Sequence, residues 1–248
     1  MLFYRHSFDA TFMESPLSDL SSANSHGGDA RQAIASPARN QLTPHVKWRY
    51  QPGDRNRLAV IMPGLLYHCD KPLFQALAQE FRQQGMGLLQ CDFDYADDPD
   101  FMNAPKMNQL DQIYRDGKSI GDLVQRLGDF DEMFLVGKSL GAMAMAAALD
   151  SGNFDQARAI WVTPGLQNST LGDQIIAHPG RSLVLMGDLD PSCLPETLAP
   201  LREAVQVRVA VIEGADHAFA ASDLFSEEDL TQAAMQALAN WMPLRPHG

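Results

Sequence analysis

Basic clusters, paired cysteines and long apolar runs are all missing from this sequence. Lys and Arg number 19 against 31 Asp and Glu, which gives a formal net charge of -12. Binding to phosphate backbones requires grouped cations, and the chain shows no such grouping. We therefore expect no nucleic-acid partner.

The three cysteines, Cys69, Cys91 and Cys193, are odd in number and lie far apart, without a C-x-x-C pair for a metal or redox site. We expect free thiols in a reducing compartment, and hence a cytoplasmic protein. No apolar run approaches the roughly 18 residues of a membrane span, and Arg5 and Asp9 interrupt the stretch where a signal peptide would be apolar. Neither secretion nor membrane insertion is expected.

The chain divides by composition into a short N-terminal segment and one large domain. Its 248 residues suit a single α/β domain with a full core. Residues 14–44 are rich in Ser, Ala, Gly, Pro and Asn and have no helical or strand periodicity. We predict an N-terminal segment over residues 1–44, largely disordered between 14 and 44, and a folded domain over residues 45–248.

From residue 45 onward, strand and helix patterns alternate. Residues 45–64 predict a β-hairpin that ends in a buried apolar strand, and residues 70–85 predict a helix with Pro72 in its first turn and Gly85 at its end. Further strands and helices follow in turn, which is typical of a mostly parallel sheet with helices on both faces. Ligands of such sheets bind beyond the carboxyl ends of the strands.

One of these strand ends carries a short motif that explains why a serine lies on a sharp turn between a strand and a helix. Residues 134–143 read FLVGKSLGAM, in which Gly137 to Gly141 form G-x-S-x-G between a buried strand and an alanine-rich helix. A sharp strand-to-helix turn would strain the backbone of Ser139 and would need residues without Cβ at Gly137 and Gly141. By itself the motif is equally consistent with a structural turn.

A serine hydroxyl is a weak nucleophile and needs a general base, which in turn needs an orienting acid. Two later strands end in suitable residues, Asp188 and Asp190 in the first and Asp216 and His217 in the second. The order serine, acid, histidine is the one expected of an α/β-hydrolase. Position alone separates Asp188 and Asp190 poorly as the acid.

With these residues the resemblance becomes specific. The segments VGKSLGA, LMGDLDPSC and IEGADHAF resemble the nucleophile elbow, acid turn and histidine loop of compact α/β-hydrolase-fold serine hydrolases. The chain is most similar to the dienelactone-hydrolase-like and testis-expressed-30-like branches, which have little or no cap domain. The resemblance implies Ser139, Asp190 and His217 as a catalytic triad.

The resemblance also implies an oxyanion hole formed by the backbone N–H groups of Leu65 and Leu140. Relatives often have His-Gly after the third strand, whereas this chain has Pro63-Gly64. His68 lies in the same loop and is a candidate for contact with substrate, with a structural or solvated role as the alternative.

Two further features have an ordinary interpretation. Lys138 adjoins the serine, but neighbouring side chains on a sharp turn point apart, so we expect a solvated charge or a residue at the pocket rim. Five aspartates between Asp92 and Asp100 do not fit the EF-hand calcium pattern, and we expect an acidic rim. No metal and no organic cofactor is expected.

These observations together predict a serine hydrolase that acts on carboxylic or thio esters of small molecules. The alternatives are a catalytically idle hydrolase fold used as a binding module and, third, a peptidase. Only about fifteen residues separate two of the later strands at the position where many relatives insert a cap, so we expect an open site without a lid.

Overall fold

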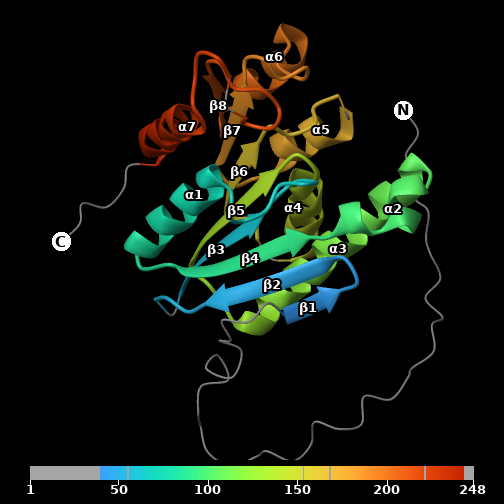
Figure 1. Ribbon diagram of the computed structural model, residues 1–248. Coiled ribbons are helices and arrows are strands. Elements are labelled where there is room, and N and C mark those ends of the chain that lie inside the picture. The colour runs from blue at the N-terminus through green and yellow to red at the C-terminus, as the bar shows by residue number, and fades with distance from the viewer. Residues whose placement is uncertain (1–39, 55, 153, 168, 221, 243–248) are drawn as a thin grey trace, which may run out of the picture.

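The computed structural model describes residues 40–242, apart from residues 55, 153, 168 and 221, and shows one mixed sheet between two layers of helices (Figure 1). The strands are β1 (Asn40–Thr43), β2 (Val46–Gln51), β3 (Arg57–Met62), β4 (Gly87–Phe93), β5 (Glu132–Lys138), β6 (Arg158–Val162), β7 (Ser182–Gly187) and β8 (Val207–Ile212). The helices are α1 (Pro72–Gln83), α2 (Pro99–Asn103), α3 (Lys106–Leu127), α4 (Leu140–Ser151), α5 (Ser169–Ala177), α6 (Pro195–Glu203) and α7 (Glu227–Trp241), and a 3-10 turn, η1, covers Tyr95–Asp97.

The strand order is β1-β2-β4-β3-β5-β6-β7-β8, and all pairs from β4 to β8 are parallel. Two apolar clusters fill the two faces of the sheet. One lies beneath α3, α4, α5 and α6 and includes Ile120 and Met145, and the other lies beneath α1 and α7 and includes Phe74 and Leu238. In Figure 1 the two groups of helices lie on opposite sides of the strands. The prediction of a mostly parallel sheet with helices on both faces is confirmed.

The predicted hairpin over residues 45–64 is wrong. Strand β2 pairs antiparallel with β1 and β4, while β3 lies between β4 and β5. The turn between β2 and β3 therefore carries the chain over β4 and does not join neighbours. Periodicity identified both strands, but strand partners are long-range contacts that periodicity does not encode.

The folded domain begins earlier than residue 45. Residues 40–43, inside the segment predicted to be largely disordered, form the edge strand β1, whose Asn40 pairs with Trp48. Residues 1–39 lie outside the described residues, so the prediction for residues 14–39 stays a prediction.

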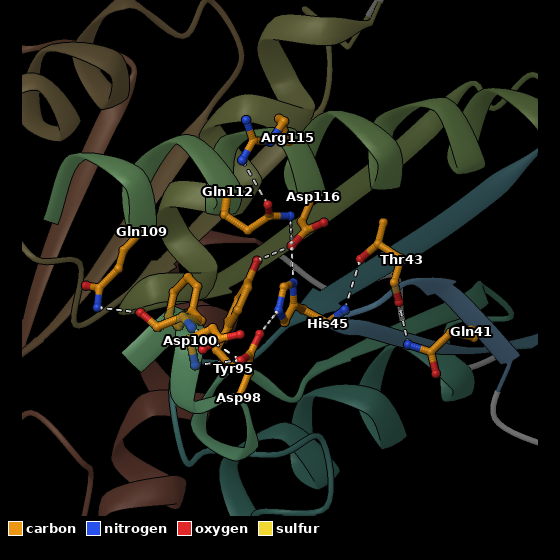
Figure 2. A network of polar contacts seen from close by, with 11 residues as sticks. Gln41, Thr43, His45, Tyr95, Asp98, Asp100, Gln109, Gln112, Arg115 and Asp116 are labelled. Carbon is orange, nitrogen blue, oxygen red and sulfur yellow. Dashed lines mark hydrogen bonds and ion pairs between the residues drawn. The ribbon is translucent and has the colours of Figure 1, made fainter. Parts of the chain in front are cut away.

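A polar network anchors the start of β2 to the middle of α3 and to the turn after β4 (Figure 2). His45 Nε2 lies 2.7 Å from Asp98 Oδ2, and Tyr95 donates a 2.7 Å hydrogen bond to the buried carboxylate of Asp116, which also accepts from Gln112. The aromatic ring of Tyr95 stacks on His45. These contacts fix the antiparallel edge of the sheet relative to its helical layer.

The parallel strands end at one edge of the sheet, and their register determines which loops meet there. Met62 pairs with Gly137, Lys138 with Val162, and Gly187 with Ile212. The loops that follow β3, β5, β6, β7 and β8 therefore start side by side, and all the candidate site residues come from them.

Candidate active site

Ser139 sits on the sharp turn that the motif predicts. Its backbone has φ 50° and ψ -115°, a conformation rarely adopted by residues with a Cβ, and α4 begins at the next residue. A Cβ at Gly137 would lie 2.7 Å from the carbonyl oxygen of Gly141, and a Cβ at Gly141 would lie 2.1 Å from that of Met62. The two glycines let the turn close and let α4 approach the end of β3.

The three residues of the predicted triad lie in one hydrogen-bonded chain. His217 Nε2 is 2.8 Å from Ser139 Oγ, and His217 Nδ1 is 2.7 Å from Asp190 Oδ2. The side chain of His217 is 44% exposed and that of Asp190 only 1%. The imidazole therefore bridges a hydroxyl that solvent can approach and a carboxylate that is enclosed.

The protein surrounds the Asp190 carboxylate with donors on both oxygens. Oδ1 accepts a 2.7 Å hydrogen bond from the Ser192 backbone N–H, and Oδ2 faces His217. Burial acts to raise the pKa of Asp190, but these hydrogen bonds outweigh it and hold the pKa below the usual value. The carboxylate is thus ionised at neutral pH.

Asp188, the competing candidate for the acid, does not face the histidine. It is exposed, and its Oδ1 accepts a 2.7 Å hydrogen bond from the Gly214 backbone N–H. Asp188 therefore braces the loop after β7 against the loop after β8.

The loop after β3 reaches the serine through Gly64. A Cβ at Gly64 would lie 3.1 Å from Ser139 Cβ, so this loop passes directly beside the nucleophile position. Leu65 follows Gly64, and Leu140 is the first residue of α4, where backbone N–H groups have no acceptor inside the helix. Both leucines named as oxyanion donors lie on segments that adjoin Ser139.

A buried aspartate supports that loop from below. Asp92, at 3% exposure, accepts a 2.8 Å hydrogen bond from the Cys69 backbone N–H. Asp94 forms an ion pair with Lys47, and Asp98 caps α2 while pairing with His45. The expected acidic rim is therefore wrong for these three residues, because their carboxylates bind partners within the domain.

His68 is not brought to the triad. Its side chain is exposed on the loop between β3 and α1, and within the described residues no hydrogen bond joins it to Ser139 or His217. A contact between His68 and substrate stays a prediction.

Lys138 differs most from expectation. It is 2% exposed, and its Nζ donates a 2.6 Å hydrogen bond to the main-chain carbonyl of His217. The prediction of a solvated or rim charge is wrong, because as the last residue of β5 its side chain points under the histidine loop. The sequence held one usable signal, a lysine directly after the buried apolar run of residues 133–137.

The three cysteines are free thiols, as expected. Within the described ranges, no group of three or more His, Cys, Asp or Glu side chains is placed to hold a metal ion. None of the helices in the described part of the chain combines the length and the apolar character that crossing a bilayer requires.

A strained serine between a parallel strand and a helix, joined to a histidine and an acid from later strand ends, defines the α/β-hydrolase class of fold. The family described as alpha/beta hydrolase domain matches residues 67–243, more than half of the chain, and the protein belongs to this family. No curated protein matches the chain in sequence.

Several solved structures share the fold. A lidless α/β serine hydrolase from Xanthomonas campestris is 19% identical, with a TM-score of 0.57 over 81% of this chain and 91% of that chain. An α/β serine hydrolase homologue from Coxiella burnetii is 16% identical, with a TM-score of 0.55 over 79% and 92% of the two chains. Mouse alpha/beta hydrolase domain-containing protein 10 is 13% identical, with a TM-score of 0.55 over 79% and 94%. At such identities the likeness shows the fold alone.

Proposed function

We propose that the protein is a serine hydrolase that cleaves carboxylic or thio esters of small molecules through an acyl-enzyme intermediate. The observation that carries the proposal is the hydrogen-bonded chain from Ser139 through His217 to Asp190, with distances of 2.8 and 2.7 Å. Within the family, the short segments quoted above favour the dienelactone-hydrolase-like and testis-expressed-30-like branches.

In the first half of the reaction, Ser139 Oγ attacks the carbonyl carbon of the ester and His217 Nε2 takes the hydroxyl proton. Asp190 accepts the Nδ1–H bond and so keeps the Nε2 lone pair directed at the serine. The negative charge that develops on the carbonyl oxygen receives hydrogen bonds from the backbone N–H groups of Leu65 and Leu140. His217 then gives its proton to the leaving alkoxide or thiolate, and the acyl group stays on Ser139.

In the second half, a water molecule replaces the leaving group. His217 takes one proton from the water, whose oxygen attacks the acyl carbon, and the oxyanion again lies against Leu65 and Leu140. Collapse of this intermediate breaks the bond to Ser139 Oγ, which recovers its proton from His217. The products are a carboxylic acid and an alcohol or thiol.

The backbone conformation of Ser139 favours an enzyme over a binding module. A strained φ of 50° costs about 1–3 kcal/mol and persists where function depends on it. A protein that used the fold only for binding would gain stability by relaxing this turn.

Labelling with a fluorophosphonate probe, together with hydrolysis of p-nitrophenyl acetate, tests the proposal. We expect Ser139→Ala to abolish labelling and to lower kcat by about 10⁴-fold or more, with an unchanged circular dichroism spectrum, because a single atom leaves a turn that the two glycines specify. Ser119→Ala, which removes a hydroxyl on α3 that donates to the Arg115 carbonyl, is the matched control and should label normally. Undiminished labelling of folded Ser139→Ala, or an unreactive wild-type protein, would contradict the proposal.

A further inference from the structure

The proposed mechanism gives no role to Lys138, whose side chain is a buried cation. Lys138 directly precedes the nucleophile and is 2% exposed, yet its Nζ does not serve Ser139, whose Oγ faces His217. Instead Nζ donates to the main-chain carbonyl oxygen of His217 at 2.6 Å. The lysine thus holds the backbone of the residue whose side chain faces the serine.

A second donor converges on the same oxygen. Thr163, which follows β6 and is fully buried, donates from Oγ1 to the His217 carbonyl at 3.1 Å. Its own backbone is strained, with φ 36°, and its N–H is bonded to Leu185. A strained, fully buried threonine whose hydroxyl reaches the histidine loop is typical of a position kept for geometry.

The surroundings of the ammonium explain how a lysine is tolerated there. Nζ lies 4.6 Å from the centre of the Tyr67 ring, a cation–π contact from the loop after β3. The negative charges of Asp190, after β7, and Asp216, after β8, favour its protonated form. Burial lowers the pKa of Lys138 to about 8, against the opposing effect of the two carboxylates.

Burying an ammonium group costs free energy, because the charge loses its contact with water. Because burial lowers the pKa of Lys138, the folded protein holds the charged form of the lysine less favourably than the unfolded chain does. The retention of Lys138 is therefore better explained by what its Nζ holds than by its contribution to stability.

We propose that Lys138 is a positioning residue that, together with Thr163, clamps the main-chain carbonyl of His217 and so holds the imidazole between Ser139 and Asp190. This inference rests on the proposed function, because it concerns the alignment of the proposed base. The clamp joins the ends of β5 and β6 to the loop after β8. The position of the His217 imidazole therefore depends on all three of these segments.

The test compares Lys138→Met and Thr163→Val, which keep the side-chain volume but lose the donor, with the double variant. Lys118→Met, an exposed position on α3, is the matched control. On p-nitrophenyl acetate we expect Lys138→Met to lower kcat by about 10- to 100-fold with KM within about twofold, because a small misplacement of a reacting group costs this much. Each single variant leaves one donor, so the fold loss of kcat in the double variant should exceed the product of the two single losses.

Thr163→Ser, which keeps the hydroxyl, should restore most of the kcat that Thr163→Val loses.

Two further measurements separate positioning from a structural role. Lys138→Met should melt at the same or a higher temperature than wild type at pH 7, since it removes a buried ammonium, and the difference should shrink above pH 8 as Lys138 loses its proton. Proton NMR should show faster solvent exchange of the His217 Nδ1–H signal in Lys138→Met. This signal does not require turnover.

The outcomes are distinguishable from failure of the proposed function. If wild-type protein reacts with neither ester nor fluorophosphonate, the hydrolase assignment fails, and the NMR exchange still supports or overturns the clamp. Unchanged kcat and unchanged exchange in Lys138→Met would overturn the clamp. A loss of kcat that follows a lowered melting temperature would overturn it as well, because it would make Lys138 a stabilising residue.

Discussion

At the scale of single residues, the charged side chains of the site, Asp190 and Lys138, form hydrogen bonds within the domain. Asp190 accepts hydrogen bonds on both oxygens, and its pKa is lowered in the folded state, by hydrogen bonds that outweigh burial. A carboxyl with a lowered folded pKa contributes stability that is fully present above its unfolded pKa of about 3.9 and is lost as the pH falls through the folded pKa. The folded protein should therefore lose this contribution only in acid.

The two aspartates of the same turn provide a matched pair of variants. An asparagine at position 190 cannot accept from both Ser192 N–H and His217 Nδ1–H, because one of its two terminal atoms is an NH₂ donor. We expect Asp190→Asn to lower kcat for p-nitrophenyl acetate by about 10³- to 10⁴-fold. Asp188→Asn keeps an oxygen for the Gly214 N–H and should lower kcat by less than about 10-fold.

Steady-state rates of the two purified variants over a range of pH check this ranking. The reverse ranking would transfer the role of orienting acid to Asp188. Equal losses of kcat would indicate that both aspartates act only by maintaining the structure of the turn.

At the scale of elements, the decisive contact is the approach of α4 to the end of β3. Gly141 brings the first turn of α4 against the carbonyl groups of Met62 and Pro63, just before the loop that carries Gly64 and Leu65. The nucleophile turn and the oxyanion loop therefore keep their spacing only while residue 141 lacks a side chain.

Gly141→Ala tests this packing. The added Cβ would lie 2.1 Å from the Met62 carbonyl oxygen, which is backbone and has little freedom to move. We expect the free energy of unfolding to fall by about 3 kcal/mol, and kcat to fall in the protein that remains folded. Gly172→Ala is the matched control, because its Cβ would meet no atom within 4 Å on α5 and should be neutral or stabilise by up to about 1 kcal/mol. Urea unfolding measures both variants, and equal stabilities would show that α4 can shift without cost.

At the scale of the whole molecule, access to the site depends on what covers the carboxyl ends of the strands. The segment between β6 and β7 forms a single nine-residue helix, α5, whose Leu171 and Ile175 belong to the core beneath α4 and α6. Within the described residues, this segment adds no cap domain over Ser139. The site should therefore retain few contacts with a long acyl chain.

We expect acetyl and butyryl p-nitrophenyl esters to have higher kcat/KM than palmitoyl esters. The net charge of -12 should also disfavour anionic esters, by a modest amount that added salt reduces. The effect is smaller than an acidic rim would produce, because Asp92, Asp94 and Asp98 bind partners within the domain. A panel that pairs each neutral ester with an anionic analogue at low and high salt measures both effects. Highest kcat/KM for palmitoyl or anionic esters would contradict an open site in a negatively charged protein.

The sequence by itself determined the general alternation of strands and helices from residue 45 onward, the turn at Ser139 and the strand ends that supply its partners. Each of these follows from local signals, namely apolar periodicity, two glycines spaced around a serine, and polar residues that end buried strands. The position of the parallel strand ends at one edge then brings Ser139, His217 and the turn with Asp188 and Asp190 together, while the choice of Asp190 as the acid came from the family resemblance.

Only the tertiary structure decided which strand lies beside which and which buried charges support the site. The pairing of β2 with β4, the Asp92 bond to the loop after β3, and the clamp of Lys138 and Thr163 on His217 all join segments far apart in the chain. A lysine or an aspartate looks solvated in a sequence because its burial depends on partners supplied by other strands. The fold supplies those partners, and burial then turns each exposed-looking charge into part of the site's support.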